Sequence, residues 1–491
     1  MSKIAIIGSG FSGLASAAYL AKAGHEVHVF EKNALPGGRA RSFHTDNGYT
    51  FDMGPSWYWM PEVFDKFFAD FGYKVSDFYK LVQLNPGFDV VYGPGDVLSV
   101  PEKRQDLYDL FESIEPGSAE RLKQFLTEAE YKYKVGMDKL VYKPGLSLTE
   151  FLDKDTILGA LRLQVFSRFS DHVRKYFIHP KLIALMEFPV LFLGAMPQDT
   201  PALYSLMNHA CLQLGTWYPM GGFYKIIEGM VEVGRRAGVQ LHTSSAVQEM
   251  VVKNGVTTGI RVNDKVLAFD AVVASADYNH VETDLVPMNK RNYDSAYWEK
   301  KTFAPSCLIF YIGVNKRVKG LKHHTLFFDE DLLQHSKEIY KNPQWPSKPL
   351  FYVCCPSQTD DSVAPAGHEN LFFLMPIATG LKDSEELREQ YFEVMLNRLQ
   401  MQTGEDIRPF IDYKKSYCVS DFMADYNSFK GNAYGLANTL MQTAILKPKM
   451  INKKIKNLFY TGQLTVPGPG VPPSLISGKV VSGLVNNYLT H

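Results

Sequence analysis

The sequence lacks an excess of either charge. Lysine and arginine together number 52, and aspartate and glutamate together also number 52, in a chain of 491 residues. Because no overall positive field attracts a polyanion, nucleic acid is not expected as a partner. The composition is that of a globular protein, with 45% hydrophobic and 21% charged residues, and the length predicts two or three domains.

Cysteine is also scarce, and its spacing excludes two kinds of site. The chain has five cysteines, an odd number, and none of them forms a C-x-x-C pair. Neither a disulfide framework nor a metal site is therefore predicted, and a reducing cytoplasm is the expected compartment. Cys354 and Cys355 are adjacent in an apolar, strand-like run, so their side chains should point to opposite faces of a sheet.

No apolar run is long and clean enough to predict a membrane-spanning helix. The most apolar region, 176–196, contains Lys181, Glu187 and two prolines. Such a stretch fits either a buried pair of helices or a surface that dips into one leaflet of a bilayer. The first residues also lack the pattern of a signal peptide, so none is predicted.

What the sequence does contain is a complete dinucleotide-binding unit at 3–32. After a short β-branched strand, Gly8, Gly10 and Gly13 follow in the spacing G-x-G-x-x-G. The first glycine allows a tight turn, the second lets a pyrophosphate approach the backbone, and the third lets the next helix pack on the strand. A second strand ends at Glu31, whose carboxylate is placed to accept a hydrogen bond from a ribose hydroxyl.

Two further segments predict contacts with the same ligand. Gly37, Gly38 and Arg39 follow the second strand closely, where glycines allow close approach and an arginine fork matches phosphate. Near the C-terminus a strand ends at Gly462, and a helix is predicted to begin around Pro472. The positive end of that helix would stabilise negative charge on a reduced isoalloxazine ring.

The chain contains no second G-x-G-x-x-G. Flavoprotein reductases that take electrons from NAD(P)H usually need two dinucleotide folds. A single copy therefore favours one tightly held FAD that passes electrons to oxygen, a quinone or another small oxidant.

Segments of cofactor-binding type occur at the start, the middle and the end of the chain. The predicted fold class is α/β: a Rossmann-type FAD-binding domain split in sequence, a mixed-sheet substrate domain, and a helical insertion that is a candidate membrane-facing surface. The predicted FAD-binding parts are 1–101, 216–290 and 451–491, the insertion is 102–215, and the substrate-binding domain is 291–450. Ser118 is predicted as the N-cap of a helix in the insertion.

Several motifs, together with the dinucleotide unit, resemble those of bacterial carotenoid (phytoene) desaturases, which belong to the wider flavin amine oxidase-like group. They are GGRARS (37–42), FDMGPSWYWMP (51–61), WYPMGG (217–222), HHTLFF (323–328), CPSQTDDSVAPAG (355–367) and YTGQLTVPGPGVPPSLISGK (460–479). The resemblance extends over essentially the whole chain. The WYWMP segment resembles the desaturases that act on phytoene itself more than relatives that act on later, oxygenated carotenoids.

The resemblance implies a set of residues around FAD. They are Gly8, Ser9, Gly10, Phe11, Ser12, Gly13, Glu31, Lys32, Gly38, Arg39, Ala40, Arg41, Pro55, Ser56, Val247, Gly462, Gln463, Val471 and Pro472. By this resemblance Glu31 binds the adenosine ribose, Arg39 and Arg41 lie near phosphate and flavin, and the Val247 backbone meets the adenine. Gln463 stands where many relatives carry an acid; its amide can still accept, but one charge-assisted hydrogen bond is lost.

The implied reaction is stepwise desaturation of 15-cis-phytoene to lycopene. Hydride leaves to the flavin, and the adjacent carbon of the resulting allylic cation loses a proton that is acidic enough to need no strong base. The catalytic residues stay unassigned. His209, His280, His323 and His324 are candidates, but a core or surface role is the first expectation for each.

The implied surroundings of the reaction follow from its substrate. Phytoene dissolves only in membranes, so the resemblance implies a cytoplasmic protein that docks on the inner face of the cell membrane, with quinone or oxygen as electron acceptor. Two alternatives stay open. One is a later-pathway carotenoid desaturase or a carotenoid cis-trans isomerase on the same fold, and the other is a non-enzymatic escort protein for prenylated proteins.

Overall fold

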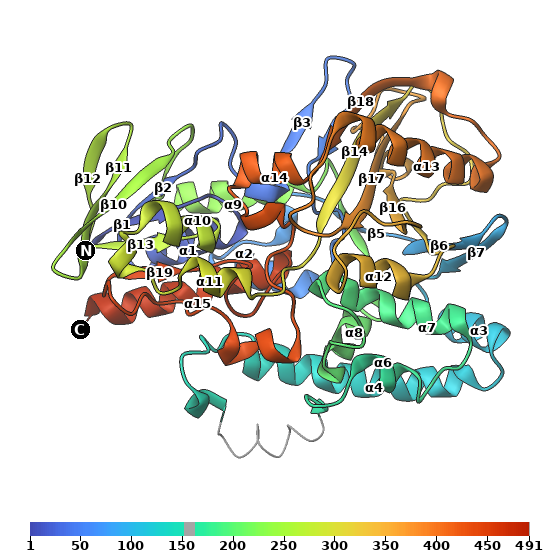
Figure 1. Cartoon of the computed structure of the whole chain (residues 1–491), viewed down its shortest axis with the longest axis horizontal. Coiled ribbons are helices and arrows are strands. Elements are labelled where there is room, and N and C mark those ends of the chain that lie inside the picture. The colour runs from blue at the N-terminus through green and yellow to red at the C-terminus, as the bar shows by residue number, and fades with distance from the viewer. Residues whose placement is uncertain (152–162, 491) are drawn as a thin grey trace.

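The computed structural model describes residues 1–151 and 163–490, so the predicted insertion 102–215 lies partly outside the described residues. Two β-sheets lie at opposite ends of the molecule, and a layer of helices covers one side of the second sheet (Figure 1). Both termini lie beside the first sheet. The two sheets contain the strands that position the candidate site.

The first sheet is a parallel, five-stranded sheet with the order β19-β13-β1-β2-β9. Its strands, in that order, are Leu458–Tyr460, Ala271–Ala274, Lys3–Ile7, Glu26–Phe30 and Gln240–His242. They come from the beginning, the middle and the end of the chain. A dinucleotide-binding domain that is split in sequence is therefore the architecture of this half of the molecule.

Both faces of this sheet are covered. In β1, Ile4 and Ile6 pack on the helical side, whereas Ala5 and Ile7 pack against a three-stranded antiparallel sheet. The helices are α1 (Phe11–Lys22), α9 (Tyr224–Arg236) and α15 (Val471–Thr490), and the antiparallel strands are β10 (Val247–Lys253), β11 (Val256–Val262) and β12 (Lys265–Ala268). Helix α1 packs between α9 and α15. A Cβ on Gly478 would overlap the Ser12 carbonyl oxygen, so a glycine is needed where α15 crosses α1.

The second sheet is mixed, seven-stranded and built around β14, with the order β18-β14-β17-β16-β15-β6-β7. Its strands, in that order, are Ile411–Tyr417, Ser306–Val314, Glu369–Ile377, Phe351–Cys354, His324–Phe327, Phe88–Gly93 and Asp96–Val100. Helix α13 (Glu385–Thr403) covers one face, where Phe392 packs 4.7 Å from Phe310 between ring centroids. Cys354 and Cys355 belong to different core clusters on the two faces, as their adjacency in the sequence predicts.

The hairpin β6–β7 falls inside the predicted first FAD-binding segment, 1–101, but it lies in the second sheet. Strand β6 pairs in parallel with β15, with Val90 opposite Leu326. An alternation of apolar residues determines which face of a strand is buried, but it carries no information about the sheet that the strand joins. That choice depends on strand β15, more than 200 residues later in the chain.

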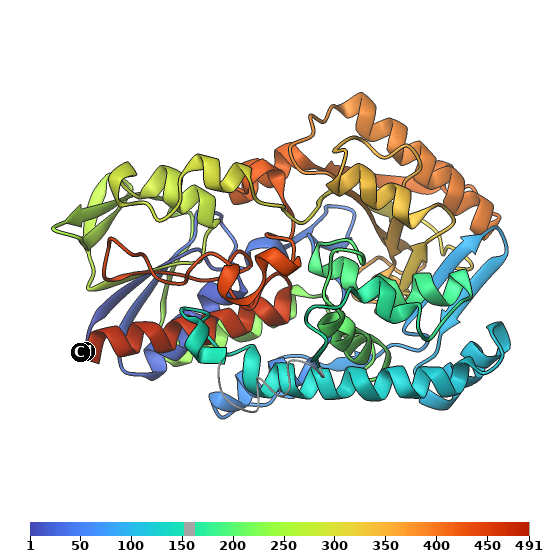
Figure 2. The same ribbon diagram turned by 60° about the horizontal axis from the view of Figure 1, so that its bottom comes forward.

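Helices α3, α4, α6, α7 and α8 form the layer beside the second sheet (Figure 2). They span Arg104–Ile114, Ser118–Val135, Phe169–Val173, Pro180–Glu187 and Leu206–Leu212. The predicted N-cap at Ser118 is one residue late, because Gly117 caps α4 in a left-handed conformation and Ser118 begins the helix. The shorter elements are β3 (Ser42–His44), β4 (Thr50–Asp52), α2 (Pro61–Asp70), β5 (Leu81–Gln83), β8 (Trp217–Pro219), α10 (Tyr278–His280), α11 (Ser295–Glu299), α12 (Leu332–Tyr340) and α14 (Val419–Tyr426).

The apolar region 176–196 is mostly buried, which agrees with the first of its two predicted alternatives, although the side chain of Ile178 is exposed. Leu182, Leu185 and Met186 of α7 are buried, and the buried Glu187 forms an ion pair with Arg174. Most of the region packs inward, because its other apolar side chains have partners within the helical layer and the second sheet. Among the described residues, no helix is both long and apolar enough to cross a membrane.

Candidate active site

One cavity of about 450 Å³ lies between the two sheets, a volume typical of small-molecule sites. At one end it is lined by the glycine-rich turn that follows β1 and by the first residues of α15. At the other end it is lined by β14, β15, β16 and β17, by helix α12 and by the helical layer. The cavity therefore joins the dinucleotide-binding half to the mixed-sheet half.

The turn after β1 has the geometry that the G-x-G-x-x-G motif predicts. Gly8 has a φ of +96°, which a residue with a side chain rarely adopts. A Cβ on Gly13 would overlap the Gly8 carbonyl oxygen, so Gly13 permits the contact between helix and strand. A Cβ on Gly10 would meet no described atom within 4 Å, although Gly10 lines the cavity. The backbone at Gly10 is therefore open to a ligand, as a pyrophosphate requires.

Glu31 lies directly after β2, at the end of the strand that borders this turn. Its Oε2 accepts hydrogen bonds from the Ser9 backbone nitrogen (3.0 Å) and the Ser9 hydroxyl (2.7 Å), and its Oε1 accepts from the Asn33 nitrogen (2.9 Å). The carboxylate is buried and lines the cavity. Its position suits recognition of a ribose, because Oε1 has a further lone pair to offer.

Arg39 and Arg41 differ in what they contact. Arg39 lines the cavity, donates to the Asn432 carbonyl (3.2 Å) and lies over the Tyr426 ring. Its Nε is buried and has no partner among the described residues, which leaves a donor for a bound ligand. Arg41 is not among the cavity-lining residues; its guanidinium donates instead to Asp425 (2.8 Å).

Asp277 is a cavity residue that sequence reasoning missed. It caps α10, where Oδ1 accepts from the Asn279 nitrogen (3.0 Å), and its buried Oδ2 has no partner within the described chain. Burial raises the pKa of the Asp277 carboxyl, and the positive charge of Arg39 opposes that rise. The signal was present in the sequence, since an aspartate a few residues after a buried strand is a common helix N-cap.

The C-terminal segment closes the same end of the cavity. Helix α15 begins with Val471, and its first residues line the cavity, so the positive end of the helix dipole faces that space. Gln463 lies beside Arg39: with its amide oxygen toward the guanidinium, it accepts from both terminal nitrogens at 3.2 and 3.0 Å. The amide that replaces the acid of many relatives is thus a neutral partner of a buried arginine.

The structure places most of the sequence-predicted cofactor residues along this cavity. Those that line it are Gly8, Ser9, Gly10, Phe11, Ser12, Glu31, Lys32, Gly38, Arg39, Ala40, Pro55, Ser56, Val247, Gln463, Val471 and Pro472. Gly13, Arg41 and Gly462 are not among the lining residues. Gly13 permits helix packing, and the Gly462 nitrogen donates to Ser477 (3.0 Å). Both residues therefore support the turn from outside the cavity lining.

The mixed-sheet end of the cavity has an aromatic and aliphatic wall. Trp57 stacks on His324 with 4.1 Å between ring centroids, and Phe188 lies 5.5 Å from Trp57. Phe188 and Leu191, from the apolar region 176–196, line the cavity. Part of this region thus contributes to an apolar binding space.

The four candidate histidines lie in different surroundings. His280 lines the cavity and is hydrogen-bonded to Asp284 (2.5 Å), while His209 packs against Tyr133 in the helical layer. His323 and His324 are buried behind the mixed-sheet wall. Sequence reasoning did not connect these last two to the cavity, because Tyr352, which joins them to it, is distant in the chain.

The residues present fit a bound FAD. The open backbone at Gly10, the carboxylate after β2, the buried unpaired donor on Arg39 and the helix end at Val471 match the pyrophosphate, ribose and flavin parts of that cofactor. Glu31 would accept a hydrogen bond from the cofactor, and Arg39 would donate one to it. No charged triad is needed for this binding.

Comparison with known proteins identifies the family. The sequence model of the family of flavin-containing amine oxidoreductases matches residues 11–486 of this chain. A carotenoid 3,4-desaturase from Haloarcula japonica is 42% identical over 477 residues, which are 97% of this chain and 96% of that protein. A 4,4'-diapophytoene desaturase (4,4'-diaponeurosporene-forming) from Staphylococcus haemolyticus is 30% identical over 499 residues, 99% of each chain.

Solved structures show the same fold at much lower identity. Putrescine oxidase bound to putrescine superposes with a TM-score of 0.63 at 13% identity, covering 99% of both chains. Cyclohexylamine oxidase from Brevibacterium oxydans superposes with a TM-score of 0.61 at 13% identity, covering 100% of both chains. The chain therefore belongs to the flavin-containing amine oxidoreductase family, within it to the carotenoid desaturases, and its cofactor is FAD.

Proposed function

We propose that this protein desaturates 15-cis-phytoene to lycopene by successive removals of hydrogen. The observation that carries the proposal is the continuity of one cavity from the cofactor turn at Gly8 to the apolar wall at Trp57 and Phe188. A hydrocarbon offers no group for a charged side chain to bind, so shape and apolar burial must hold it. The WYWMP segment of this wall, which resembles desaturases that act on phytoene, supports this choice of substrate.

The cavity indicates which part of the reaction the cofactor performs and which part the residues of the chain perform. FAD, when bound, supplies a two-electron acceptor for hydride from an allylic C–H bond. The residues of the chain align the polyene, exclude water and stabilise the bound cofactor through Arg39 and the end of α15. Quinone or oxygen is the proposed final electron acceptor.

The test is incubation of the purified protein and FAD with phytoene-loaded liposomes, followed by absorption spectra and mass of the extracted carotenoids. We expect visible absorption of lycopene and a loss of two mass units for each new double bond. Phytoene recovered unchanged, with the flavin still oxidised under anaerobic conditions, would contradict the proposal.

A second candidate is a later 3,4-desaturation, because a carotenoid 3,4-desaturase is 42% identical over nearly the whole chain. Lycopene supplied in place of phytoene separates the two reactions. Conversion of lycopene to a product with two fewer hydrogens, with no conversion of phytoene, favours the later step. Isomerisation would change the spectrum without changing the mass, and an escort protein would stay colourless after addition of FAD.

Access to such a substrate requires contact with a lipid phase. We propose that the protein associates peripherally with the inner face of the cell membrane. Two large apolar side chains in the segments that precede α6 and α7, Phe166 and Ile178, support this; they are 87% and 81% exposed. Sedimentation with liposomes is the test: Phe166→Ser together with Ile178→Ser should reduce lipid binding and leave the flavin spectrum unchanged. Equal sedimentation of both proteins would contradict the proposed contact.

A further inference from the structure

Tyr352 is placed to connect the cavity to two buried histidines. Its side chain lines the cavity, and its hydroxyl lies 3.0 Å from the Ser56 hydroxyl and 2.6 Å from Nδ1 of His324. Both Tyr352 and His324 are buried, with 6% and 0% of their surface exposed. Trp57 stacks on the His324 imidazole with an interplanar angle of 11°, which holds the ring in place.

The chain of polar groups continues away from the cavity. His323 lies beside His324, with 4.5 Å between ring centroids, and its Nδ1 is 2.8 Å from the hydroxyl of the half-buried Thr359. The Nε2 atoms of both histidines are buried and have no hydrogen-bond partner among the described residues. Buried imidazole nitrogens normally have partners, so two free ones in adjacent rings call for an explanation.

The two imidazoles lie close enough for a proton to pass between them, directly or through one bridging water molecule. One ring nitrogen of each histidine lies within 4.8 Å of the other, and two hydrogen bonds that meet at a water span roughly 4.5–5 Å. A cavity of about 20 Å³, whose lining includes His323 and Cys354 but not His324, has room for one water molecule beside His323.

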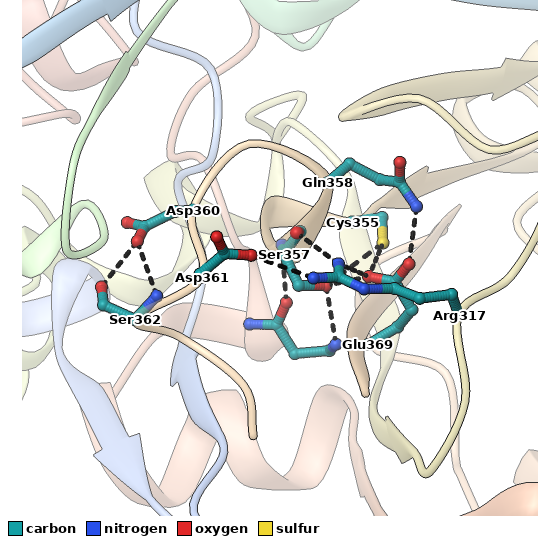
Figure 3. A network of polar contacts seen from close by, with 9 residues as sticks. Arg317, Cys355, Ser357, Gln358, Asp360, Asp361, Ser362 and Glu369 are labelled. Carbon is teal, nitrogen blue, oxygen red and sulfur yellow. Dashed lines mark hydrogen bonds and ion pairs between the residues drawn. The ribbon is translucent and has the colours of Figure 1, made fainter. Parts of the chain in front are cut away.

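The loop that ends the chain of polar groups is held rigidly (Figure 3). Ser357 donates to the buried Glu369 carboxylate, and Gln358 donates to the same group at 2.6 Å. On the other side of Thr359, Asp360 accepts from the Ser362 hydroxyl at 2.6 Å. These anchors fix the backbone on both sides of Thr359, so its hydroxyl keeps its position against His323.

We propose that Tyr352 accepts the proton that the substrate releases and that His324, His323 and Thr359 carry this proton toward solvent. The inference rests on the proposed function, because only a dehydrogenation releases a proton in the cavity. The substrate loses two hydrogens: one leaves as hydride to the flavin, and the other leaves as a proton. The electron pair of that second C–H bond becomes the new C=C bond.

The proton balance along the relay is complete. As the substrate proton joins the Tyr352 oxygen, the proton of the Tyr352 hydroxyl passes to Nδ1 of His324, so the tyrosine stays neutral throughout. His324 then releases its Nε2 proton to the unpartnered Nε2 of His323, directly or through one water molecule, and Nδ1 of His323 donates toward Thr359. Burial lowers the pKa of His324 well below its usual value, so the ring is neutral and able to accept at neutral pH. A weak base suffices, because the proton beside an allylic cation is strongly acidic.

The central test replaces Tyr352 with Phe, which keeps the ring and removes the hydroxyl. We expect kcat for polyene desaturation to fall about 10²-fold while KM changes less than about 2-fold, the usual size of a proton-transfer contribution. The flavin spectrum and the FAD affinity should be unchanged. Tyr49→Phe is the matched control, because the Tyr49 hydroxyl lies 2.8 Å from Nδ1 of His368 in a pair that does not line the cavity.

Two further readouts separate a relay from a merely structural role. The wild-type rate of flavin reduction by the polyene should be lower in D₂O than in H₂O, and Tyr352→Phe should abolish that difference. His324→Phe keeps the stacking on Trp57 and should cost about as much as Tyr352→Phe. The double variant should be no slower than either single variant, because groups that act as one unit are not additive.

The outcomes separate a failure of the proposed function from a failure of the proton relay. If no carotenoid reduces the wild-type flavin, the proposed function fails and the relay fails with it. If the wild type is active and Tyr352→Phe keeps full kcat and the D₂O effect, the relay alone is overturned. Stoichiometric metal retained by the purified protein and lost in His323→Ala would also overturn it, since the imidazole lone pairs would then be occupied.

Discussion

The two ends of the cavity are built in opposite ways. The cofactor end consists of short segments close to single strands, such as the turn from Gly8 to Gly13 and the carboxylate of Glu31 at the next strand end. The apolar end is assembled from residues such as Trp57, Phe188 and Tyr352, which lie far apart in the chain and meet only in the fold. The cofactor end is a short local motif that many flavoproteins share. The apolar end is specific to the tertiary structure of this protein.

The largest effect should come from breaking the cofactor end at Gly13. In Gly13→Val the new side chain overlaps the Gly8 carbonyl oxygen, so α1 cannot pack against β1. We expect loss of FAD and of most soluble protein, measured by the ratio of absorbance at 450 and 280 nm and by yield. Gly10→Ala is the control: its Cβ meets no described atom, so the protein should fold and only bind FAD more weakly. A flavin-loaded, stable Gly13→Val protein would contradict this account.

Breaking the apolar end should separate binding of cofactor from turnover. Trp57→Ala removes the half-buried ring that packs on His324 and Phe188, and we expect a loss of stability below the value of about 3–5 kcal/mol for a fully buried aromatic. The melting temperature and the conversion of polyene should fall, while the purified protein keeps its flavin. Denaturant unfolding and carotenoid extraction measure the two effects. Loss of FAD in Trp57→Ala, at a temperature where the protein is folded, would show that the two ends are not separable.

A milder change at Glu31 should weaken FAD binding without unfolding. In Glu31→Gln, the amide cannot accept from Ser9 and Asn33 through both ends, because its nitrogen is a donor. A lost charge-assisted hydrogen bond costs about 1.5–3 kcal/mol, which corresponds to roughly a 10- to 150-fold weaker Kd. Titration of the apoprotein with FAD, followed by flavin fluorescence, measures the change. An unchanged Kd would exclude Glu31 from the cofactor site.

The smallest effect concerns Asp52, whose carboxylate accepts from the first backbone nitrogens of α9, Phe223 (2.7 Å) and Tyr224 (3.2 Å). Burial raises its pKa to about 7. Because the unfolded chain releases this proton at a lower pH than the folded protein, the group costs stability progressively from about pH 4 to pH 7, and the full cost persists above pH 7. Melting temperatures of Asp52→Asn should fall less than those of the wild type as pH rises from 4 to 8. Parallel pH curves would contradict the raised pKa.

Sequence reasoning succeeded where a motif carries its own geometry. The strand, turn and helix at 3–22, and the helix predicted around Pro472, lie within a few residues of their observed positions. It did not reach the choice of partners: segment 88–100, which lies within the predicted first FAD-binding segment, joins the second sheet. The two alternatives left open for 176–196 were separated only by the structure, in which most of the region is buried. Arg41, which follows the same motif as Arg39, contacts Asp425 because α14 lies on that side of the turn.

The sequence by itself determined the family, the FAD and the glycine-rich turn, because these depend on backbone conformations and residue types a few positions apart. Only the tertiary structure decided what the cavity wall contains. His324 and Tyr352 become partners because β15 and β16 pair in one register, and Trp57 covers them from a separate loop. Contacts across such distances depend on which strands pair and on which faces are buried, and no local pattern in the chain records that choice.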